Sequence, residues 1–308
     1  MSEFELIDHA FRAKLPFKHS LTSIASGDDA SVHSVPDGFE LVVSSDMSVA
    51  GVHWPHDFPL EKAACRAVNA ALSDLAAMGA EASWVWVCAA LKDGNAAESM
   101  GDGIAAAISG SGIELAGGDT VHAADNSLSV TVAGVLPKGT AMRRDAARDG
   151  DDIWLCGDLG LAAHALRQWQ QGDCSAQVMK AFGDVQPRLS EGLALRTAGV
   201  RCCIDVSDGM LADVAHLAEA SKVGMDIELS LIPSFHQLER LLDEDDAANL
   251  VLAGGEDYAL ICTAPAALHE TLSSLAVRIG RCRSGRGVRA MLDGVEVQTI
   301  NRGFDHFA

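Results

Sequence analysis

The sequence predicts a protein of the α/β (α+β) class, built from two mixed α/β domains. Its 308 residues suit two domains of ordinary size, each able to bury a core. Strand-like and helix-like runs alternate through both halves of the chain. Two turn-rich polar segments, 137–139 and 148–152, lie near the middle. We therefore expect one domain over residues 1–147 and a second over residues 148–308.

The first half is expected to hold two long strands with helices and shorter strands between them. A β-rich run at 39–45 is expected to stop at Asp46, and 127–136 alternates like a half-buried strand. A helix over 60–78 is apolar nearly all round and ends before Gly79, so we expect it to be deeply buried. The remaining elements expected here are a strand at 84–91, a helix at 96–109 and a short strand at 113–116.

The second half restarts the alternation of strands and helices. Asp208 is expected to open a helix over 209–221, whose first turn suits an anion or a metal with its ligands. The other expected elements are strands at 153–156, 202–205 and 258–263, helices near 159–170, 188–198, 236–252 and 265–275, and terminal strands.

Six acidic stretches stand where apolar runs stop. They are Gly27-Asp28-Asp29, Ser44-Ser45-Asp46, Leu72-Ser73-Asp74, Gly117-Gly118-Asp119, Asp205-Val206-Ser207-Asp208 and Gly255-Glu256-Asp257. Two carboxylates ~4 Å apart repel by about 4 kcal/mol at an effective dielectric constant near 20, so converging carboxylates need cations among them. Magnesium usually joins one or two carboxylates to substrate phosphates, which predicts phosphate chemistry.

Each acidic position also has a structural alternative. Asp46 suits a ligand site at a strand end, with Ser44 and Ser45 as further oxygen donors, but it also suits a turn or a helix cap. Asp74 lies in an apolar helix, so it must be neutral, bound to metal or paired, for example with Asn69 or the local backbone.

Two further motifs combine groups that suit phosphate and metal. Gly117-Gly118-Asp119-Thr120 lets the backbone approach a phosphate beside a carboxylate, and Asp205-Val206-Ser207-Asp208 offers two carboxylates and a hydroxyl at a helix start. Arg143-Arg144 is the positive counterpart, either as a phosphate clamp or as surface ion pairs.

Composition excludes several classes of protein. A net charge of −20 argues against a nucleic-acid or anionic-membrane partner. The eight cysteines form no Cys-x-x-Cys pair and lie mostly in apolar runs, and no apolar stretch is long enough to span a membrane, which predicts a cytoplasmic protein. A P-loop and protein-kinase motifs are absent, and the glycine patterns at 101–106 and 285–290 lack the strand–turn–helix setting of a dinucleotide site.

Taken in order, the motifs resemble the thiamine-monophosphate kinase family, which belongs to the superfamily typified by aminoimidazole ribonucleotide synthetase. The resemblance rests on the acidic stretches above together with Gly51-Val52-His53, the string from Asn69 to Ala80, Gly254-Gly255-Glu256-Asp257-Tyr258 and Gly303-Phe304-Asp305-His306-Phe307. It implies two domains of the aminoimidazole ribonucleotide synthetase-like kind. The N-terminal domain would bind ATP and Mg²⁺ and form a homodimer, and the C-terminal domain would complete the active site.

The resemblance also implies an activity and a set of site residues. The γ-phosphoryl group of ATP would pass directly to thiamine monophosphate, with Asp29, Asp46, Asp119 and Asp208 as catalytic residues. Several magnesium ions would be held by Asp29, Ser44, Ser45, Asp46, Asp74, Asp119, Asp205 and Asp208. ATP would contact Gly118, Asp119, Arg144 and Ser207, while the thiamine part would contact His53, Glu256 and Phe304.

The chain departs from the family pattern at a few positions, and two other functions stay open. Ser45-Asp46-Met47 stands where the family more often has Thr-Asp-Thr, and Phe304 replaces a commoner Tyr or Trp. No aromatic occurs at 100–105, where the family usually contacts adenine. One alternative is another ATP-dependent synthetase of the same superfamily, and the other is a non-catalytic protein that binds divalent metals.

Overall fold

The computed structural model describes residues 3–297 and confirms a mixed α/β architecture. The chain forms two compact units. The first contains Met1–Leu75 and Ala80–Gly139, and the second contains Ala76–Gly79 and Thr140–Ala308. Each unit has its own sheet, with four strands in the first and seven in the second, besides a separate two-stranded sheet of β1 (Thr22–Ile24) and β2 (Val32–His33).

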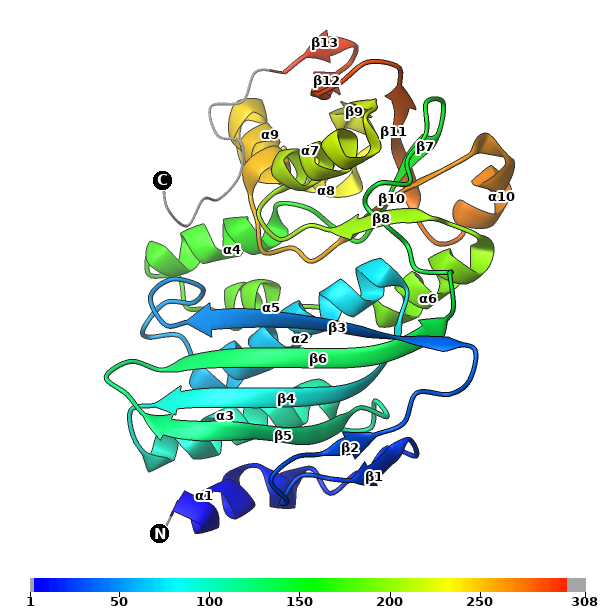
Figure 1. The fold of residues 1–308 in the computed structure, drawn as a ribbon. Coiled ribbons are helices and arrows are strands. Elements are labelled where there is room, and N and C mark those ends of the chain that lie inside the picture. The colour runs from blue at the N-terminus through cyan, green and yellow to red at the C-terminus, as the bar shows by residue number, and fades with distance from the viewer. Residues whose placement is uncertain (1–2, 298–308) are drawn as a thin grey trace. The chain divides into compact units, whose positions relative to one another are not determined.

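The sheet of the first unit has the order β3-β6-β4-β5 (Figure 1). Its strands are β3 (Phe39–Val49), β6 (Ser127–Pro137), β4 (Glu81–Leu91) and β5 (Glu114–His122). β6 pairs antiparallel with β3 on one side and with β4 on the other, while β4 and β5 are parallel and joined through α3 (Gly94–Ile108). The predicted strands at 84–91 and 127–136 and the helix at 96–109 are confirmed within a few residues.

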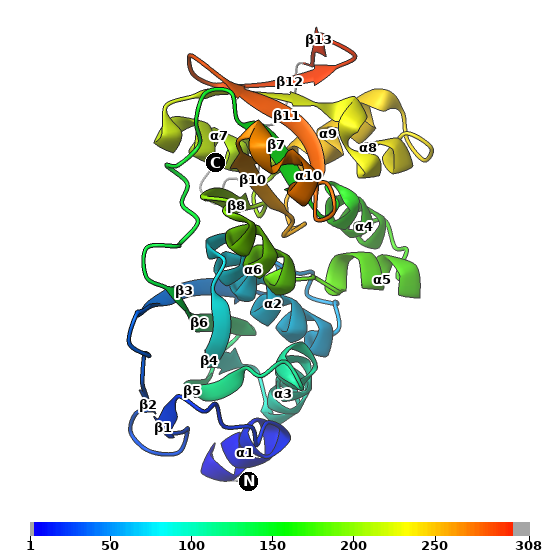
Figure 2. The same ribbon diagram turned by 90° about the vertical axis from the view of Figure 1, so that its right-hand side faces the viewer.

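One face of this sheet is covered by helices and the other is not. The predicted helix over 60–78 is confirmed as α2 (Leu60–Met78), and α2 and α3 lie on the same side of the sheet (Figure 2). Alternate residues of β6 that face them, such as Val130 and Val132, are buried. On the opposite face Leu41, Val43 and Met47 of β3 are 51%, 55% and 61% exposed. The first unit therefore carries a sheet face that is apolar and uncovered along β3, whereas Trp84 on the same face is buried and donates to Thr22 of β1.

Two predicted strand ends were wrong. β3 does not stop at Asp46 but continues to Val49, and β5 does not stop at 116 but runs through Gly117-Gly118-Asp119 to His122. The reason is the pairing partner, because β3 stays in register with β6 as far as Val49 opposite Ser127. A continuous ladder of backbone hydrogen bonds outweighs the weak β-propensity of Ser, Asp and Gly.

The glycine pattern at 101–106 has a packing role in the structure. A Cβ at Gly101 would lie 1.7 Å from the carbonyl oxygen of Ala10, the last residue of α1 (Glu3–Ala10), which the sequence did not predict. A Cβ at Gly103 would lie 2.1 Å from the carbonyl oxygen of Glu61 in α2. The two glycines thus let α1 and α2 approach α3 closely. This supports the rejection of the motif as a dinucleotide site.

The sheet of the second unit has the order β13-β12-β9-β11-β7-β10-β8 (Figure 1). Its strands are β7 (Asp152–Cys156), β8 (Cys202–Asp205), β9 (Gly224–Glu228), β10 (Leu260–Ala264), β11 (Val277–Arg283), β12 (Val288–Leu292) and β13 (Val295–Glu296). Only β9 and β12 pair in parallel; the other neighbours are antiparallel. The strands at 153–156 and 202–205 were predicted, and β9 was not.

Helices cover both faces of the seven-stranded sheet. One face packs its isoleucines against α7 (Met210–Ser221), α8 (Pro233–Leu238) and α9 (Glu244–Ala253). The other face packs Trp154, Cys203 and Cys262 against α6 (Leu189–Ala198) and α10 (His269–Leu272). The remaining helices are α4 (Leu161–Gln170) and α5 (Ala176–Gly183), of which α5 was not predicted.

Other predictions for the second unit need correction. The helix expected near 236–252 is two helices, α8 and α9, and the one expected over 265–275 is a 3₁₀ turn, Ala266–Leu268, followed by the single turn of α10. β10 begins at Leu260 instead of 258, because Glu256 and Tyr258 have φ of 74° and 52°, which no strand residue adopts. Within residues 3–297 no helix is both long and apolar enough to cross a membrane.

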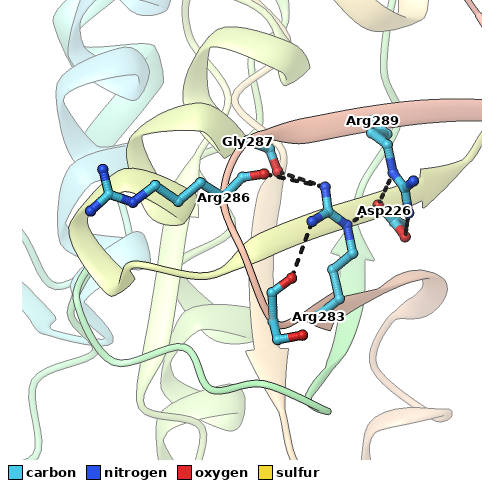
Figure 3. A network of polar contacts seen from close by, with 6 residues as sticks. Asp226, Arg283, Arg286, Gly287 and Arg289 are labelled. Atoms are coloured by element: carbon cyan, nitrogen blue, oxygen red, sulfur yellow. Dashed lines mark hydrogen bonds and ion pairs between the residues drawn. The ribbon is translucent and has the colours of Figure 1, made fainter.

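Two arginines, one on β11 and one on β12, form hydrogen bonds with Asp226 of β9 (Figure 3). Asp226 of β9 accepts hydrogen bonds from Arg283 Nε at 2.7 Å and from Arg289 Nε at 2.8 Å. Arg283 also donates to the carbonyl oxygens of Arg286 and Gly287. The hydrogen bond from Arg289 is the main reason that the pKa of the Asp226 carboxyl lies below its ordinary value; Arg283 adds to it and partial burial opposes it.

We expect Asp226→Asn to lower the free energy of unfolding by about 1–2 kcal/mol at pH 7, because two charge-assisted hydrogen bonds are weakened. A carboxyl whose pKa is lower in the folded state stabilises the protein above its unfolded pKa, near 4, and loses this effect as the pH falls. The difference between wild type and variant in the urea midpoint should therefore shrink from pH 7 to pH 4. Glu219→Gln, on the exposed side of α7, is the control and should change the midpoint little.

Candidate active site

The predicted ligands on β3 lie on two faces of the sheet. Residues alternate along a strand, so Ser44 and Asp46 share the face covered by α2 and Ser45 lies on the other. Ser44 Oγ donates a hydrogen bond of 2.5 Å to Asp74 Oδ2 on α2. Ser45 Oγ is 2.9 Å from Thr131 Oγ1 of β6 instead. Ser44 and Asp74 are thus brought together, whereas the Ser45 hydroxyl faces away from them.

The structure answers the question of how Asp74 is accommodated in an apolar helix. Asp74 is partly buried and accepts a hydrogen bond from the Ser44 hydroxyl. Asn69, the alternative partner, instead donates to the sulfur of Cys65 at 3.6 Å. The Ser44–Asp74 pair offers oxygen ligands of the kind that Mg²⁺ prefers.

Asp119 does not lie with Asp46 within the first unit. Three strand pairings connect Asp119 to β3. Asp119 of β5 pairs with Cys88 of β4, Cys88 pairs with Ser129 of β6, and Ser129 pairs with Met47 of β3. Directly paired residues share a face, so Asp119 lies on the uncovered face, on the side of Met47. Asp46 lies on the other face and three strand spacings away, about 14 Å.

A cavity of about 930 Å³ brings Asp29, Gly118 and Asp119 together in the first unit. Gly118 has φ of 152° and lies so close to Val87 that a Cβ would be 1.9 Å from its carbonyl oxygen. Only glycine fits this position, which brings bare backbone to the cavity wall. The close approach that Gly118 allows here is to the backbone of Val87, and the approach of this backbone to a phosphate stays a prediction.

The same cavity holds two residues that the sequence did not single out. Trp86 lies in its wall, and its indole nitrogen donates to Ser31 Oγ at 3.0 Å. Arg12 donates to Asp8 at 2.7 Å and to the carbonyl oxygen of Ser26 at 3.2 Å. No sequence signal marks either, because both depend on the N-terminal segment folding back beside the Gly27-Asp28-Asp29 turn.

His53 lies in the turn that follows β3. Its Nδ1 accepts a hydrogen bond from the backbone N–H of Val49 at 3.1 Å, and the backbone N–H of His53 donates to the carbonyl oxygen of Val49 at 2.9 Å. The imidazole is therefore fixed by its Nδ1 atom at the end of β3. His53 does not line the cavity that contains Asp29 and Asp119.

In the second unit, three predicted residues meet at one edge of the sheet. β7 and β8 both pair antiparallel with β10, so they run parallel and end at the same edge. There the N–H of Glu256 donates to the carbonyl oxygen of Ser207, and the N–H of Tyr258 donates to that of Val206, both at 2.8 Å. Asp208 follows Ser207 in the same loop. Carboxyl ends of strands are where ligands of α/β sheets commonly bind.

Asp213, which the sequence analysis missed, holds this loop in place. One carboxylate oxygen, Oδ2, accepts the backbone N–H groups of Ser207, Asp208 and Gly209 at 3.0, 3.2 and 3.2 Å. The side chain is buried in the first turn of α7. Burial, and then the nearby carboxylates of Asp208 and Asp205, raise the pKa of Asp213 to about 7, although the N–H groups of Ser207 and Asp208 oppose this shift.

Arg144 is not placed beside Ser207 within the second unit. The carbonyl oxygen of Arg144 accepts the hydroxyl of Ser221 at 2.8 Å and the thiol of Cys202 at 3.9 Å, so it lies at the start of β8. Ser207 follows the other end of β8, about 16 Å further along the strand. The neighbouring Arg143 forms the surface ion pair that was the alternative to a phosphate clamp, with Asp145 Oδ1 2.8 Å from its Nε.

Comparison with known proteins decides the family. The profile of the AIR synthase related protein N-terminal domain matches residues 27–136, and that of the C-terminal domain matches residues 148–293. The thiamine-monophosphate kinase of Escherichia coli (strain K12) is 34% identical over 298 residues, which cover 92% of this chain and 91% of that protein. The chain belongs to the thiamine-monophosphate kinase family.

Solved structures of this kinase family have the same fold. The crystal structure of the thiamine-monophosphate kinase from Stenotrophomonas maltophilia K279a matches with a TM-score of 0.84 at 38% identity, covering 96% of this chain and 98% of that one. AaThiL complexed with AMPPCP and TMP matches with a TM-score of 0.77 at 25% identity, covering 99% and 97%.

The oxygen donors that a kinase of this family would use for Mg²⁺ form separate groups in each unit. Among residues 3–297 no group of three or more His, Cys, Asp or Glu side chains forms a metal cage by itself. The donors do fit magnesium in kind, because Ser44 and Asp74 are in contact and Asp205 and Asp208 flank the loop before α7. An ion with so few protein ligands would take the rest from phosphate and water. Phe304 lies outside the described residues.

Proposed function

We propose that this chain transfers the γ-phosphoryl group of ATP to thiamine monophosphate, giving thiamine diphosphate and ADP. The observation that carries the proposal is the similarity to thiamine-monophosphate kinases over nearly the whole chain. The structure complexed with AMPPCP and TMP supports it, since that relative binds an ATP analogue together with the acceptor.

The proposed roles of the site residues are those that the motifs imply. Gly118, Asp119, Arg144 and Ser207 would contact ATP, while Glu256, His53 and Phe304 would contact the thiamine part. Bound Mg²⁺ would neutralise the phosphates, held by Asp29, Ser44, Ser45, Asp46, Asp74, Asp119, Asp205 and Asp208. Asp29, Asp46, Asp119 and Asp208 would be the residues on which turnover depends most. Such a transfer needs alignment and charge neutralisation more than covalent help, so we propose direct in-line transfer.

The proposal includes a homodimer formed through the first unit, in a cytoplasmic enzyme. The uncovered sheet face supports a dimer, because Leu41, Val43 and Met47 are exposed in a row along β3. The separation of Asp119 from Asp46 gives a second reason, since ligands on opposite faces of one sheet need another surface to complete a site. Sedimentation of the purified protein tests the dimer, and a Val43→Lys variant should be a monomer.

The test of the activity is ADP release on adding thiamine monophosphate with ATP and Mg²⁺. We expect turnover with thiamine monophosphate and none with free thiamine. A chelator should abolish turnover, and added Mg²⁺ should restore it. Turnover with free thiamine alone would reassign the acceptor. No ADP release with either acceptor would favour another synthetase of the superfamily or a metal-binding protein. A burst that reveals a competent phosphoenzyme would exclude direct transfer.

A further inference from the structure

A second cavity, of about 580 Å³, lies wholly within the second unit beside Glu256. Its charged lining residues are Asp158, Lys180, Asp184, Arg188, Glu256 and Asp257. Asp158 follows the end of β7, so the cavity opens at the edge of the sheet where the Ser207–Asp208 loop also lies. Positively and negatively charged side chains therefore line the same cavity at this edge of the sheet.

Unusual backbone conformations gather at this cavity. Five non-glycine residues in the described part of the chain have positive φ, and Arg188 and Glu256, at 48° and 74°, both line the cavity. Tyr258, at 52°, donates its hydroxyl to Glu256 Oε2 at 3.2 Å. A left-handed conformation costs a non-glycine residue about 1–2 kcal/mol, and such strain concentrates at functional sites. The cavity therefore has the backbone signature of a binding site.

Arg188 has donor capacity that the protein leaves unused. Among the residues that the structure describes, its Nε is buried without a hydrogen-bond partner, and its guanidinium makes one long contact, 3.4 Å from Nη1 to Glu191 Oε1. A Cβ at Gly157 would lie 3.2 Å from both Nε and Nη2, so the guanidinium rests against the end of β7. A buried N–H without a partner is costly unless a ligand or water supplies an acceptor.

Thiamine monophosphate has the matching distribution of charge. It carries a cationic thiazolium ring and an anionic phosphate, and a guanidinium binds phosphate through two parallel N–H groups. Asp257 is already used, because its two oxygens accept the N–H groups of Gly160 and Ala162 at the start of α4. The other carboxylates that line the cavity with Arg188 are those of Asp158, Asp184 and Glu256.

We propose that this cavity binds the phosphate end of the acceptor, with Arg188 as the phosphate-recognising residue and Lys180 as a second cation. The inference rests on the proposed function and deepens it. It assigns to Arg188 the discrimination between thiamine monophosphate and free thiamine, which differ only in this phosphate. The unused donors of Arg188 and its strained backbone are the two observations that point to it.

The test compares binding of thiamine monophosphate and of thiamine by calorimetry with Mg²⁺ and without ATP. Wild type should bind the phosphate ester at least about tenfold more tightly than thiamine. Arg188→Gln should lose this preference, with little change in thiamine affinity. In turnover assays its KM for thiamine monophosphate should rise at least about tenfold, while the KM for ATP stays within about twofold. A rise in the KM for ATP alone would show that Arg188 serves the nucleotide and would overturn the inference.

Two further variants separate binding from folding. Arg167→Gln removes an arginine from α4 that pairs with Asp246 at 3.5 Å and does not line the cavity, so it should leave both affinities unchanged. Arg188→Gly suits the positive φ and should keep the urea midpoint near that of wild type or above it while losing the phosphate preference. Unchanged affinity for thiamine monophosphate in both Arg188 variants would overturn the inference. If wild type releases no ADP but the variants still lose this affinity, only the proposed function fails.

Discussion

Replacing Asp46 by Asn should lower turnover at least about 100-fold while the protein stays folded. The carboxylate of Asp46 lies on the same face of β3 as Ser44, whose hydroxyl donates a hydrogen bond to Asp74. The carboxylate is therefore one of the oxygen groups proposed to hold Mg²⁺. Asn keeps the size of the side chain but removes the charge that attracts the ion. Removal of one electrostatic contact to a transition state commonly costs about 10²–10³ in rate. Steady-state turnover, together with the concentration of Mg²⁺ needed for half-maximal activity, measures the loss.

The control for Asp46 removes the same charge elsewhere in the first unit. Asp37→Asn changes an exposed aspartate just before β3 and should leave both turnover and the Mg²⁺ requirement unchanged. Circular dichroism and the urea midpoint of both variants should match wild type. Full turnover by Asp46→Asn at the same Mg²⁺ concentration would remove this residue from the metal site.

Replacing Asp213 by Ala should destabilise the second unit by about 2–4 kcal/mol and weaken its binding of Mg²⁺ with ATP. The variant leaves three backbone N–H groups of the Ser207–Gly209 loop without their common acceptor, and an unsatisfied buried donor costs about 1–3 kcal/mol. The loop that presents Ser207 and Asp208 then loses its fixed conformation. Urea unfolding measures the first effect, and calorimetric titration with Mg²⁺ and an ATP analogue measures the second.

Two matched variants show whether Asp213 acts through its acceptor atom. Asp213→Asn keeps one oxygen in place and removes the charge that Asp205 and Asp208 repel, so it should be nearly as stable as wild type. Glu219→Ala removes an exposed carboxylate from the same helix and should change the midpoint by less than about 0.5 kcal/mol. Equal losses in Asp213→Ala and Asp213→Asn would show that the charge matters and not the acceptor.

Local pattern was sufficient to predict most elements of the fold. The bounds of α2 and β8 were predicted from apolar runs and their stopping residues, because these elements are buried and the pattern reflects that burial. The ends of β3 and β5 were wrong because the pairing partner, distant in sequence, extends them through residues of poor β-propensity. The position of β9 depends in the same way on partners more than fifty residues later.

The candidate site was predictable to the extent that motifs carry it. Ser44 and Asp74, which the motifs predict as metal ligands, are in contact. Ser207 and Glu256, predicted to contact ATP and the thiamine part, are joined by a backbone hydrogen bond that the sequence did not predict. The sheet faces of Ser45 and Asp119 could not be predicted from the motifs. Arg188 and Asp213 were missed because neither stands in a recognisable motif. Their importance comes from an unused donor and from an acceptor shared by three N–H groups, which only coordinates reveal.

The strand order of the second unit has a consequence for its synthesis on the ribosome. Within residues 3–297, β7, with its Ile-Trp-Leu-Cys run, pairs only with β10 and β11, which are made more than a hundred residues later. At a synthesis rate of about 5–20 residues per second, the nascent chain exposes this apolar segment for several seconds. Pairings so distant along the chain also slow folding. Newly made chains should therefore depend on chaperones until β11 emerges, whereas the finished enzyme should not.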